Sequence, residues 1–225
     1  MVRIMKQANI EIVGEYGPFP GIDRVHGLTC DGRRIWFATD GKLVALDPAS
    51  GDLLDSIDTA ADAGTAFDGK HLFQMAGASI HKIDPNTGQV LVTIPAPAGE
   101  GCNSGLAWAE GSLWVGQYNE RKIHQVDPDT GAIMRTIESN RFVTGVTWAG
   151  DELWHATWDG DDNELRRLDP ATGDVLESLN LPHGVGVSGL EYDGNDQFFC
   201  GRGASGKVSV VRRPDRGVAT DSDNA

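Results

Sequence analysis

The sequence has few cysteines and no long apolar run, and these two absences exclude several classes of protein. Its three cysteines, Cys30, Cys102 and Cys200, are an odd number without a C-x-x-C spacing, so they indicate neither a disulfide framework nor a zinc site. No stretch approaches the roughly 20 apolar residues of a membrane-spanning helix, and the first residues lack the apolar core of a signal peptide. We therefore expect a cytoplasmic protein that does not enter a membrane.

Basic residues are scarce as well, which limits the partners that the protein can attract. Lys and Arg number 19 against 33 Asp and Glu, and the formal net charge is −14. A surface of this sign repels nucleic acid and anionic lipid. We therefore expect binding to neither nucleic acid nor membranes, and we interpret the acidic turns as a contribution to solubility.

The short motifs that identify many enzymes are missing too. The sequence contains no G-x-S-x-G, no P-loop and no H-E-x-x-H, which are common signatures of hydrolases, nucleotide-binding enzymes and zinc proteases. Any active site must therefore be assembled by the fold from residues that are distant in sequence.

What the sequence does contain is one pattern that occurs five times. Each copy aligns without a gap from the residue before a glycine through two short strands, and the glycines are Gly27, Gly64, Gly105, Gly145 and Gly189. The spacings are 37, 41, 40 and 44 residues. A period of about 40 residues with four strands per unit is typical of a β-propeller blade.

Two further positions of the repeat have a physical explanation. An aromatic residue recurs in the second strand and is expected to form the core between blades; these residues are Trp36, Phe73, Trp114, Trp154 and Phe198. An Asp-Pro pair starts the last turn of the first four copies, and a glycine closes it, which is favourable turn chemistry. The pairs begin at Asp47, Asp84, Asp127 and Asp169.

The last copy lacks a fourth strand, and a matching segment stands at the other end of the chain. Residues 10–17 resemble the fourth strand of the other copies and come just before the first copy. Pairing this segment with the last blade would remove two exposed sheet edges. We therefore predict an all-β, five-bladed propeller with four antiparallel strands per blade, closed by an N-terminal strand.

We interpret residues 1–225 as a single domain. Its predicted parts are a closing strand at 10–17, blades near 26–58, 63–95, 104–138, 144–180 and 188–213, and a polar tail at 215–225.

Glu191 is the sharpest departure from the repeat, and departures that packing does not require are candidates for function. Its position holds only small side chains elsewhere, namely Thr29, Ala66, Ala107 and Thr147. A carboxylate in an inner strand is costly to bury unless it is paired, protonated or bound to a metal. We predict a catalytic carboxylate here; the alternative is a structural one that bonds the backbone or Arg202 at a blade seam.

His26 is the second catalytic candidate. It acts as a general base or metal ligand in one interpretation, and in the other it only caps a loop. The equivalent positions hold Ala63, Ser104, Thr144 and Ser188. Of the other histidines, we expect His155 to pack between blades, and His71, His81 and His124 to lie at the surface.

Histidines and carboxylates also suggest cation sites. His26, His183 and Glu191 come from the first and last copies, which are neighbours in a closed ring, and their side chains are metal ligands. We therefore predict one divalent cation if the fold brings the three together. In the acidic loop 158–164, Asp159 and Asp161 would bind calcium, or the loop is a solvated hairpin tip.

Polar and aromatic residues of the loops around the channel mouth are candidates for substrate binding. Tyr118 and Trp158 would stack on a sugar, a ring or a cation, or pack as a lid over a blade edge. The full set is Asn103, Ser104, Gln117, Tyr118, Thr144, Trp158, Ser188 and Arg202.

The repeat G-L-x-x-D-G-x-x-L-W, followed by D-P-x-T-G-x-V, resembles the blades of the glutaminyl cyclases and of the lactonase-like, virginiamycin B lyase-like and quinoprotein-like propellers. The cyclases are five-bladed, which the resemblance implies here. Their first-blade Q-G-L corresponds to His26–Leu28, and their carboxylate to residues 38–40, where no Glu stands. Their L-E-aromatic motif resembles Leu190–Tyr192, although here it lies in the last blade rather than the penultimate one.

We predict from these observations a small-molecule-binding propeller with a polar site at the mouth of its central channel. If it is an enzyme, the chemistry is that of an acid–base or metal-assisted lyase, hydrolase or cyclase, with Glu191 or His26 moving the proton. Asn103 or Arg202 would then stabilise negative charge. The alternative is a non-catalytic scaffold or lectin for a protein or glycan partner.

Overall fold

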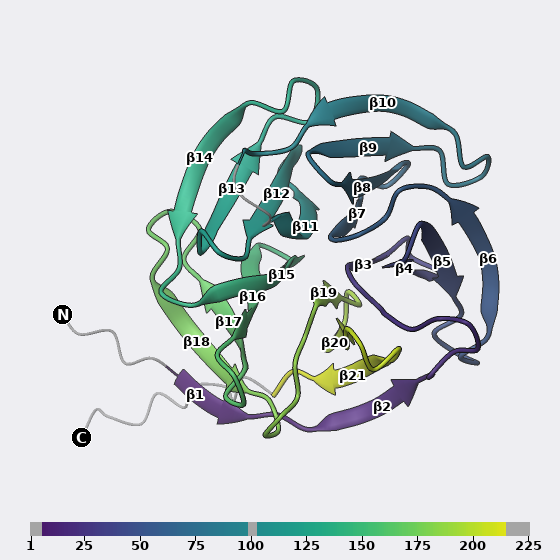
Figure 1. Ribbon diagram of the computed structural model, residues 1–225. Helices are drawn as coiled ribbons and strands as arrows, with labels where there is room; N and C mark the ends of the chain where they lie inside the picture. The colour runs from purple at the N-terminus through teal and green to yellow at the C-terminus, as the bar shows by residue number, and fades with distance from the viewer. Residues whose placement is uncertain (1–5, 99–102, 215–225) are drawn as a thin grey trace, which may run out of the picture.

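Five small sheets arranged in a ring make up the protein (Figure 1). The computed structural model describes residues 6–98 and 103–214, so Cys102 and the tail at 215–225 lie outside the described residues. The described part consists of strands β1–β21 and contains no helix, hence none that could span a membrane. The predicted all-β, five-bladed propeller is confirmed.

Each repeat forms one sheet, and its first strand lies innermost in the ring (Figure 1). Blade one comprises β3 (Leu28–Cys30), β4 (Ile35–Thr39), β5 (Lys42–Leu46) and β6 (Leu53–Asp58). Blade two comprises β7 (Thr65–Phe67), β8 (Leu72–Ala76), β9 (Ser79–Ile83) and β10 (Val90–Pro95). Blade three comprises β11 (Asn103–Ala109), β12 (Ser112–Gln117), β13 (Lys122–Val126) and β14 (Ile133–Glu138). Blade four comprises β15 (Phe142–Ala149), β16 (Glu152–Trp158), β17 (Glu164–Leu168) and β18 (Val175–Asn180), and blade five comprises β19 (Gly189–Tyr192), β20 (Gln197–Gly201) and β21 (Val208–Arg212).

The N-terminal strand closes the ring as predicted. Strand β2 (Ile12–Tyr16) pairs antiparallel with β21 and supplies the fourth strand of blade five. Closure continues into blade one, because the Ser188 hydroxyl donates to the carbonyl oxygen of Val25 at 2.6 Å and Val25 forms a bridge with Gly203. The first and last blades are therefore joined through backbone as well as side chains.

A fifth strand in blade four was not predicted. Strand β1 (Lys6–Asn9) runs parallel to β18, and Gln7 and Asn9 bond the side chain of Asn180. The next residue, Ile10, is 4% exposed and anchors the strand to the core of blades four and five. The segment K-Q-A-N is short and polar, so it has no alternating apolar pattern that would predict a strand.

The centre of the ring is closed by the repeated glycines, which corrects the expectation of an open channel. A Cβ on Gly27 would lie 2.4 Å from the Cα of Gly64, and one on Gly189 would lie 2.4 Å from the His26 carbonyl oxygen. Neighbouring inner strands thus touch through their backbones, as only glycine permits. The space that these glycines enclose with Leu28, Thr65, Leu106, Val146 and Leu190 has no room for a water molecule.

The aromatic position of the repeat fills the seams between blades. In blades one to four its side chains, Trp36, Phe73, Trp114 and Trp154, are 0% exposed and pair with the inner-strand position that Glu191 holds in blade five. In blade five Glu191 pairs with Phe199, which packs against blade one, so the prediction of Phe198 for this position was one residue out. Phe198 packs instead against Trp154 of blade four, with ring centroids 5.1 Å apart. The predicted core between blades is therefore confirmed for the first four aromatic residues.

Candidate functional site

The candidate residues lie on two opposite faces of the ring. We call the face with the segments that join one blade to the next the connector face, and the face with the Asp-Pro turns the turn face. In the register of blade five, Gly189 pairs with Gly201 and Glu191 with Phe199, so Glu191 lies two residues further along the strand, toward the turn face. The other predicted site residues belong to the connector face, on the far side of the closed glycine layer.

Glu191 joins three blades. Its Oε1 accepts hydrogen bonds from the Thr29 hydroxyl at 3.3 Å and from the Cys30 backbone N–H at 3.1 Å, both in blade one. Its Oε2 accepts a bond from the Thr147 hydroxyl of blade four at 2.9 Å. Burial raises the pKa of the Glu191 carboxyl to about 7, and these donors only partly oppose the shift. These contacts match the structural alternative, with blades one and four in the place of Arg202.

The structure does not bring the three predicted metal ligands together. His26 lies on the connector face with its Nε2 3.6 Å from Asp40 Oδ1, whereas Glu191 lies beyond the glycine layer. His183 is 80% exposed and has its Nε2 3.6 Å from Asp161 Oδ2. Within the described residues, no group of three or more His, Cys, Asp or Glu side chains could hold a metal ion.

The acidic loop after β16 is organised by an asparagine. Asn163 is 1% exposed; its Oδ1 accepts a bond from the Asp159 backbone N–H, and its Nδ2 donates to the Gly160 carbonyl. The Asp159 carboxylate pairs with Arg141 at 3.5 Å, and Asp161 pairs with His183. The two carboxylates therefore have separate partners, in keeping with a solvated hairpin tip.

Two hydroxyl groups among the candidates connect neighbouring blades. Ser104 donates to the Val143 carbonyl of blade four at 2.6 Å, as Ser188 does to Val25 of blade one. Thr144 is 9% exposed, and its buried hydroxyl has no hydrogen-bond partner in the part of the chain that the structure describes. Ser104 and Ser188 therefore connect neighbouring blades, whereas Thr144 does not.

Gln117 and Asn103 belong to a buried network that includes a histidine. The Gln117 amide donates to Asn103 Oδ1 at 3.3 Å and to the Pro97 carbonyl, so its oxygen is left to accept a bond from His124 Nε2–H at 2.8 Å. His124 Nδ1 then accepts from the Thr136 hydroxyl at 2.8 Å. His124 is only 6% exposed, and burial lowers its pKa. The expectation that it lies at the surface was therefore wrong.

The remaining binding candidates, Tyr118, Arg202 and Trp158, differ in how much of each side chain is left exposed by its contacts. Tyr118 stacks on Phe142 with ring centroids 4.7 Å apart, and thus packs as a lid between blades three and four. Arg202 donates to Ser209 at 2.9 Å inside blade five. Trp158 is 40% exposed on the connector face. Of these three side chains, Trp158 offers the largest free surface.

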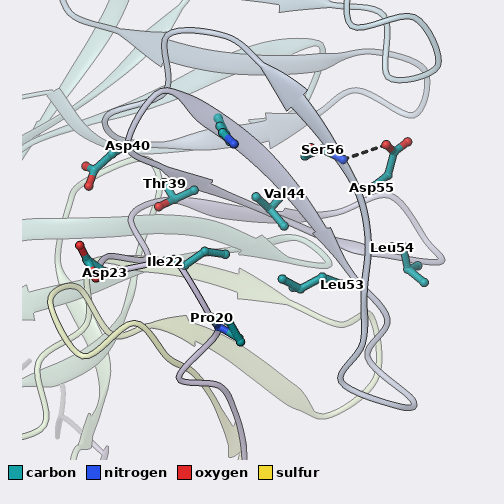
Figure 2. Close-up of a pocket in the computed structure, with 12 residues that line it drawn as sticks. Pro20, Ile22, Asp23, Thr39, Asp40, Val44, Leu53, Leu54, Asp55 and Ser56 are labelled. Atoms are coloured by element: carbon teal, nitrogen blue, oxygen red, sulfur yellow. Dashed lines mark hydrogen bonds between the residues drawn. The ribbon is translucent and has the colours of Figure 1, made fainter.

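A cleft that the sequence did not reveal lies on the flank of blade one (Figure 2). We call it the blade-one cleft; its volume is about 470 Å³. In Figure 2, Asp23 and Asp40 stand at one end of the cleft and Asp55 stands at the outer strand, with apolar side chains such as Ile22 and Leu53 between them. The lining residues are Pro20, Gly21, Ile22, Asp23, Thr39, Asp40, Lys42, Val44, Leu53, Leu54, Asp55 and Ser56.

At the cleft, blade one has an apolar side chain at a position that other blades fill with larger side chains or with bonded polar groups. Val44 on β5 is opposite Ser56 on β6. In blade three the equivalent pair is His124 and Thr136, which bond each other. The equivalents of Val44 are the larger His81, His124 and Arg166 and, in blade five, the smaller Ser209, which bonds Arg202 and Glu15. The signal for the cleft in the sequence is therefore this position of the third strand, where blade one has an apolar side chain without such partners.

Solved structures share this fold at low sequence identity. A glutaminyl cyclase of Myxococcus xanthus superposes with a TM-score of 0.76 and 18% identity, covering 92% of this chain and 97% of that chain. Hydrazine synthase of Kuenenia stuttgartiensis gives a TM-score of 0.53 and 16% identity, with 80% and 56% covered. A chain of a mitotic checkpoint complex gives 0.52 and 15%, with 85% and 65% covered. The expected resemblance to glutaminyl cyclases is confirmed for the fold.

Sequence comparison gives one family. None of the curated proteins compared with this chain matches it. A family model described as outer membrane protein assembly factor BamB matches residues 76–217, which is more than half of the chain. The chain therefore belongs to this family, PQQ_2, of repeat proteins.

Proposed function

We propose that the protein is a small-molecule-binding propeller and that its ligand occupies the blade-one cleft. The observation that carries this proposal is the cleft itself, about 470 Å³ in volume and bounded by apolar and charged side chains. Ligand sites in proteins are concave, mostly of roughly 300–1,000 Å³, and combine apolar walls with a few polar groups. The fold alone supports enzymes and scaffolds equally.

The geometry favours the cleft over the channel mouth. The axis is sealed by glycine backbones. Several side chains that were expected to meet a ligand there are engaged within the protein: Ser104 and Ser188 bond neighbouring blades, and Gln117 bonds His124. A ligand at the mouth would have to displace these bonds, whereas the cleft is already open.

A substitution that fills the cleft tests the proposal. Ser56 lies on the outer strand and is exposed, so Ser56→Trp should place its indole in the cleft without disturbing the core. Thr93→Trp is the matched control, since Thr93 is the exposed equivalent in blade two, opposite His81. The probes are phenethylamine, 2-phenylethanol and 3-phenylpropanoate, measured by saturation-transfer NMR and titration calorimetry.

We expect at least one probe to bind the wild type. Ser56→Trp should weaken that binding by tenfold or more, because its indole would occupy the space of the ligand. Thr93→Trp should leave the binding unchanged. Absence of binding by all three probes, or equal binding by wild type and Ser56→Trp, would contradict the proposal.

A second candidate function is acid–base catalysis at the same site. It is favoured by His26, which does not line the cleft itself but has its Nε2 3.6 Å from Oδ1 of Asp40, a residue that does. A carboxylate in this position would orient the imidazole toward a bound ligand. His26→Gln is expected to abolish any conversion of a bound ligand, followed by NMR, while its affinity stays within about twofold. Conversion at the wild-type rate would exclude this role.

The alternative of a scaffold rests on apolar side chains of the outer strands. Leu91 on β10 and Met134 on β14 are 44% and 59% exposed, and both strands lie at the rim of the ring (Figure 1). Exposed apolar surface marks many protein–protein interfaces. Neither residue lines the blade-one cleft, so a partner at the rim and a ligand in the cleft are compatible.

A further inference from the structure

We propose that the ligand of the blade-one cleft is an organic cation, with an apolar body and a primary ammonium or comparable group at one end. This inference rests on the proposed function, because it assigns a chemical class to the same site. It follows from the distribution of charge and apolar surface within the cleft.

Two carboxylates stand at one end of the cleft. Asp23 belongs to the segment that leads into blade one, and Asp40 to the turn after β4; both line the cleft and stand on the same side of it in Figure 2. Both are exposed. The Nε2 of His26 lies 3.6 Å from Asp40 Oδ1, and among the described residues neither carboxylate forms an ion pair with Lys or Arg. Because no described lysine or arginine neutralises them, both attract a cation from solution.

The total charge of the lining has the same sign. Asp23, Asp40 and Asp55 oppose a single ammonium group, that of Lys42. Asp55 accepts a bond from the Ser56 backbone N–H at 2.8 Å, so its carboxylate is held at the outer strand. The excess of negative charge in the cleft disfavours anionic ligands and favours cations.

The rest of the lining selects an organic cation over a metal ion. Ile22, Val44 and Leu53 form the apolar part of the cleft (Figure 2). Val44 is 5% exposed and Leu53 40% exposed, so a bound apolar group would cover further surface of Leu53. Metal ions need several converging donors, and the described residues contain no such group of three. Apolar burial combined with charge pairing fits an amine on a hydrocarbon body.

The three phenyl probes test this assignment because they differ mainly in charge. At low ionic strength phenethylamine is expected to bind roughly tenfold more tightly than 2-phenylethanol, and 3-phenylpropanoate most weakly. Added salt should reduce the preference for the amine. The double variant Asp23→Asn/Asp40→Asn should lower the affinity for the amine to that for the alcohol and leave the alcohol unchanged.

A control variant separates the effect of the two carboxylates at the cleft from that of the protein's net charge. Asp151 is an exposed carboxylate in a turn on the opposite face, and Asp151→Asn should leave the preference for the amine intact. Equal affinities for amine and alcohol, both lost in Ser56→Trp, would overturn the cation assignment and leave the cleft as a ligand site. A preference that survives in the double variant would also overturn it, because net charge alone would then explain the preference. Failure of all probes to bind would overturn both proposals.

Discussion

Gly64→Ala is expected to destabilise the protein severely, by roughly 3 kcal/mol or more. A Cβ at this position would lie 2.4 Å from the backbone nitrogen of Leu106 and 2.7 Å from its Cβ. Both atoms belong to the inner strand of the next blade, so relief requires moving one blade relative to another. Close-packed interiors resist such a shift. Urea denaturation followed by tryptophan fluorescence would measure the loss of unfolding free energy.

Another glycine of the fold provides the control. Gly14 lies on the closing strand, and a Cβ there would make an ordinary contact of 3.6 Å with Val210. Gly14→Ala should change the unfolding free energy by no more than about 0.5 kcal/mol, and restricting the unfolded chain favours the variant. If both variants were equally stable, backbone contact between inner strands would not be what closes the axis.

Glu191→Gln is expected to make the protein relatively more stable as the pH rises. The folded-state pKa of Glu191 is about 7, above its ordinary value of 4.5. Its contribution to stability is therefore full below about pH 4.5 and is lost as the pH rises through 7. Glutamine mimics the protonated acid and does not titrate. The difference in unfolding free energy, variant minus wild type, should increase by about 2.5 kcal/mol between pH 5 and pH 8.

The variant must be compared with the wild type at each pH, because His155 makes the stability of the wild type change with pH in the opposite direction. Burial and the charge of Arg166 lower the pKa of His155 from 6.5 to about 3. Its contribution is present above pH 6.5 and is lost as the pH falls toward 3. The two residues partly cancel between pH 4.5 and 7, so the wild-type profile alone is uninformative. A difference between Glu191→Gln and wild type that does not vary with pH would show that the carboxyl of Glu191 titrates normally.

The architecture could be predicted from the sequence because each of its determinants repeats. The glycines, the aromatic position and the Asp-Pro turns recur with the blade, and residues 10–17 matched the missing strand. The blade-one cleft was not predicted, since it depends on the volume of Val44 relative to His124 and Arg166 in the third strands. The hydrogen-bond partners of Glu191 could not be predicted from the sequence either. Thr29 is 162 residues away and Thr147 is 44 residues away, and only the curvature of the ring brings them to one point.

The sequence could not show that His26 and Glu191 lie on opposite sides of the glycine layer. His26 and Glu191 occupy neighbouring blades, and their sequence positions suggested a common location. Each inner strand runs from the connector face to the turn face. Residues before and after its glycine therefore lie toward opposite faces of the ring. Alignment identified which residues depart from the repeat but gave no measure of this separation.

The closing strand also sets an order of events during synthesis on the ribosome. Glu15 on β2 bonds Ser209 on β21, which follows it by 194 residues. At about 5–20 residues per second, translation of that distance takes roughly 10–40 s. Throughout that time β2 has no partner, so the ring remains an open arc with two free sheet edges. A circular permutant in which residues 6–16 follow β21 would complete blade five without this delay.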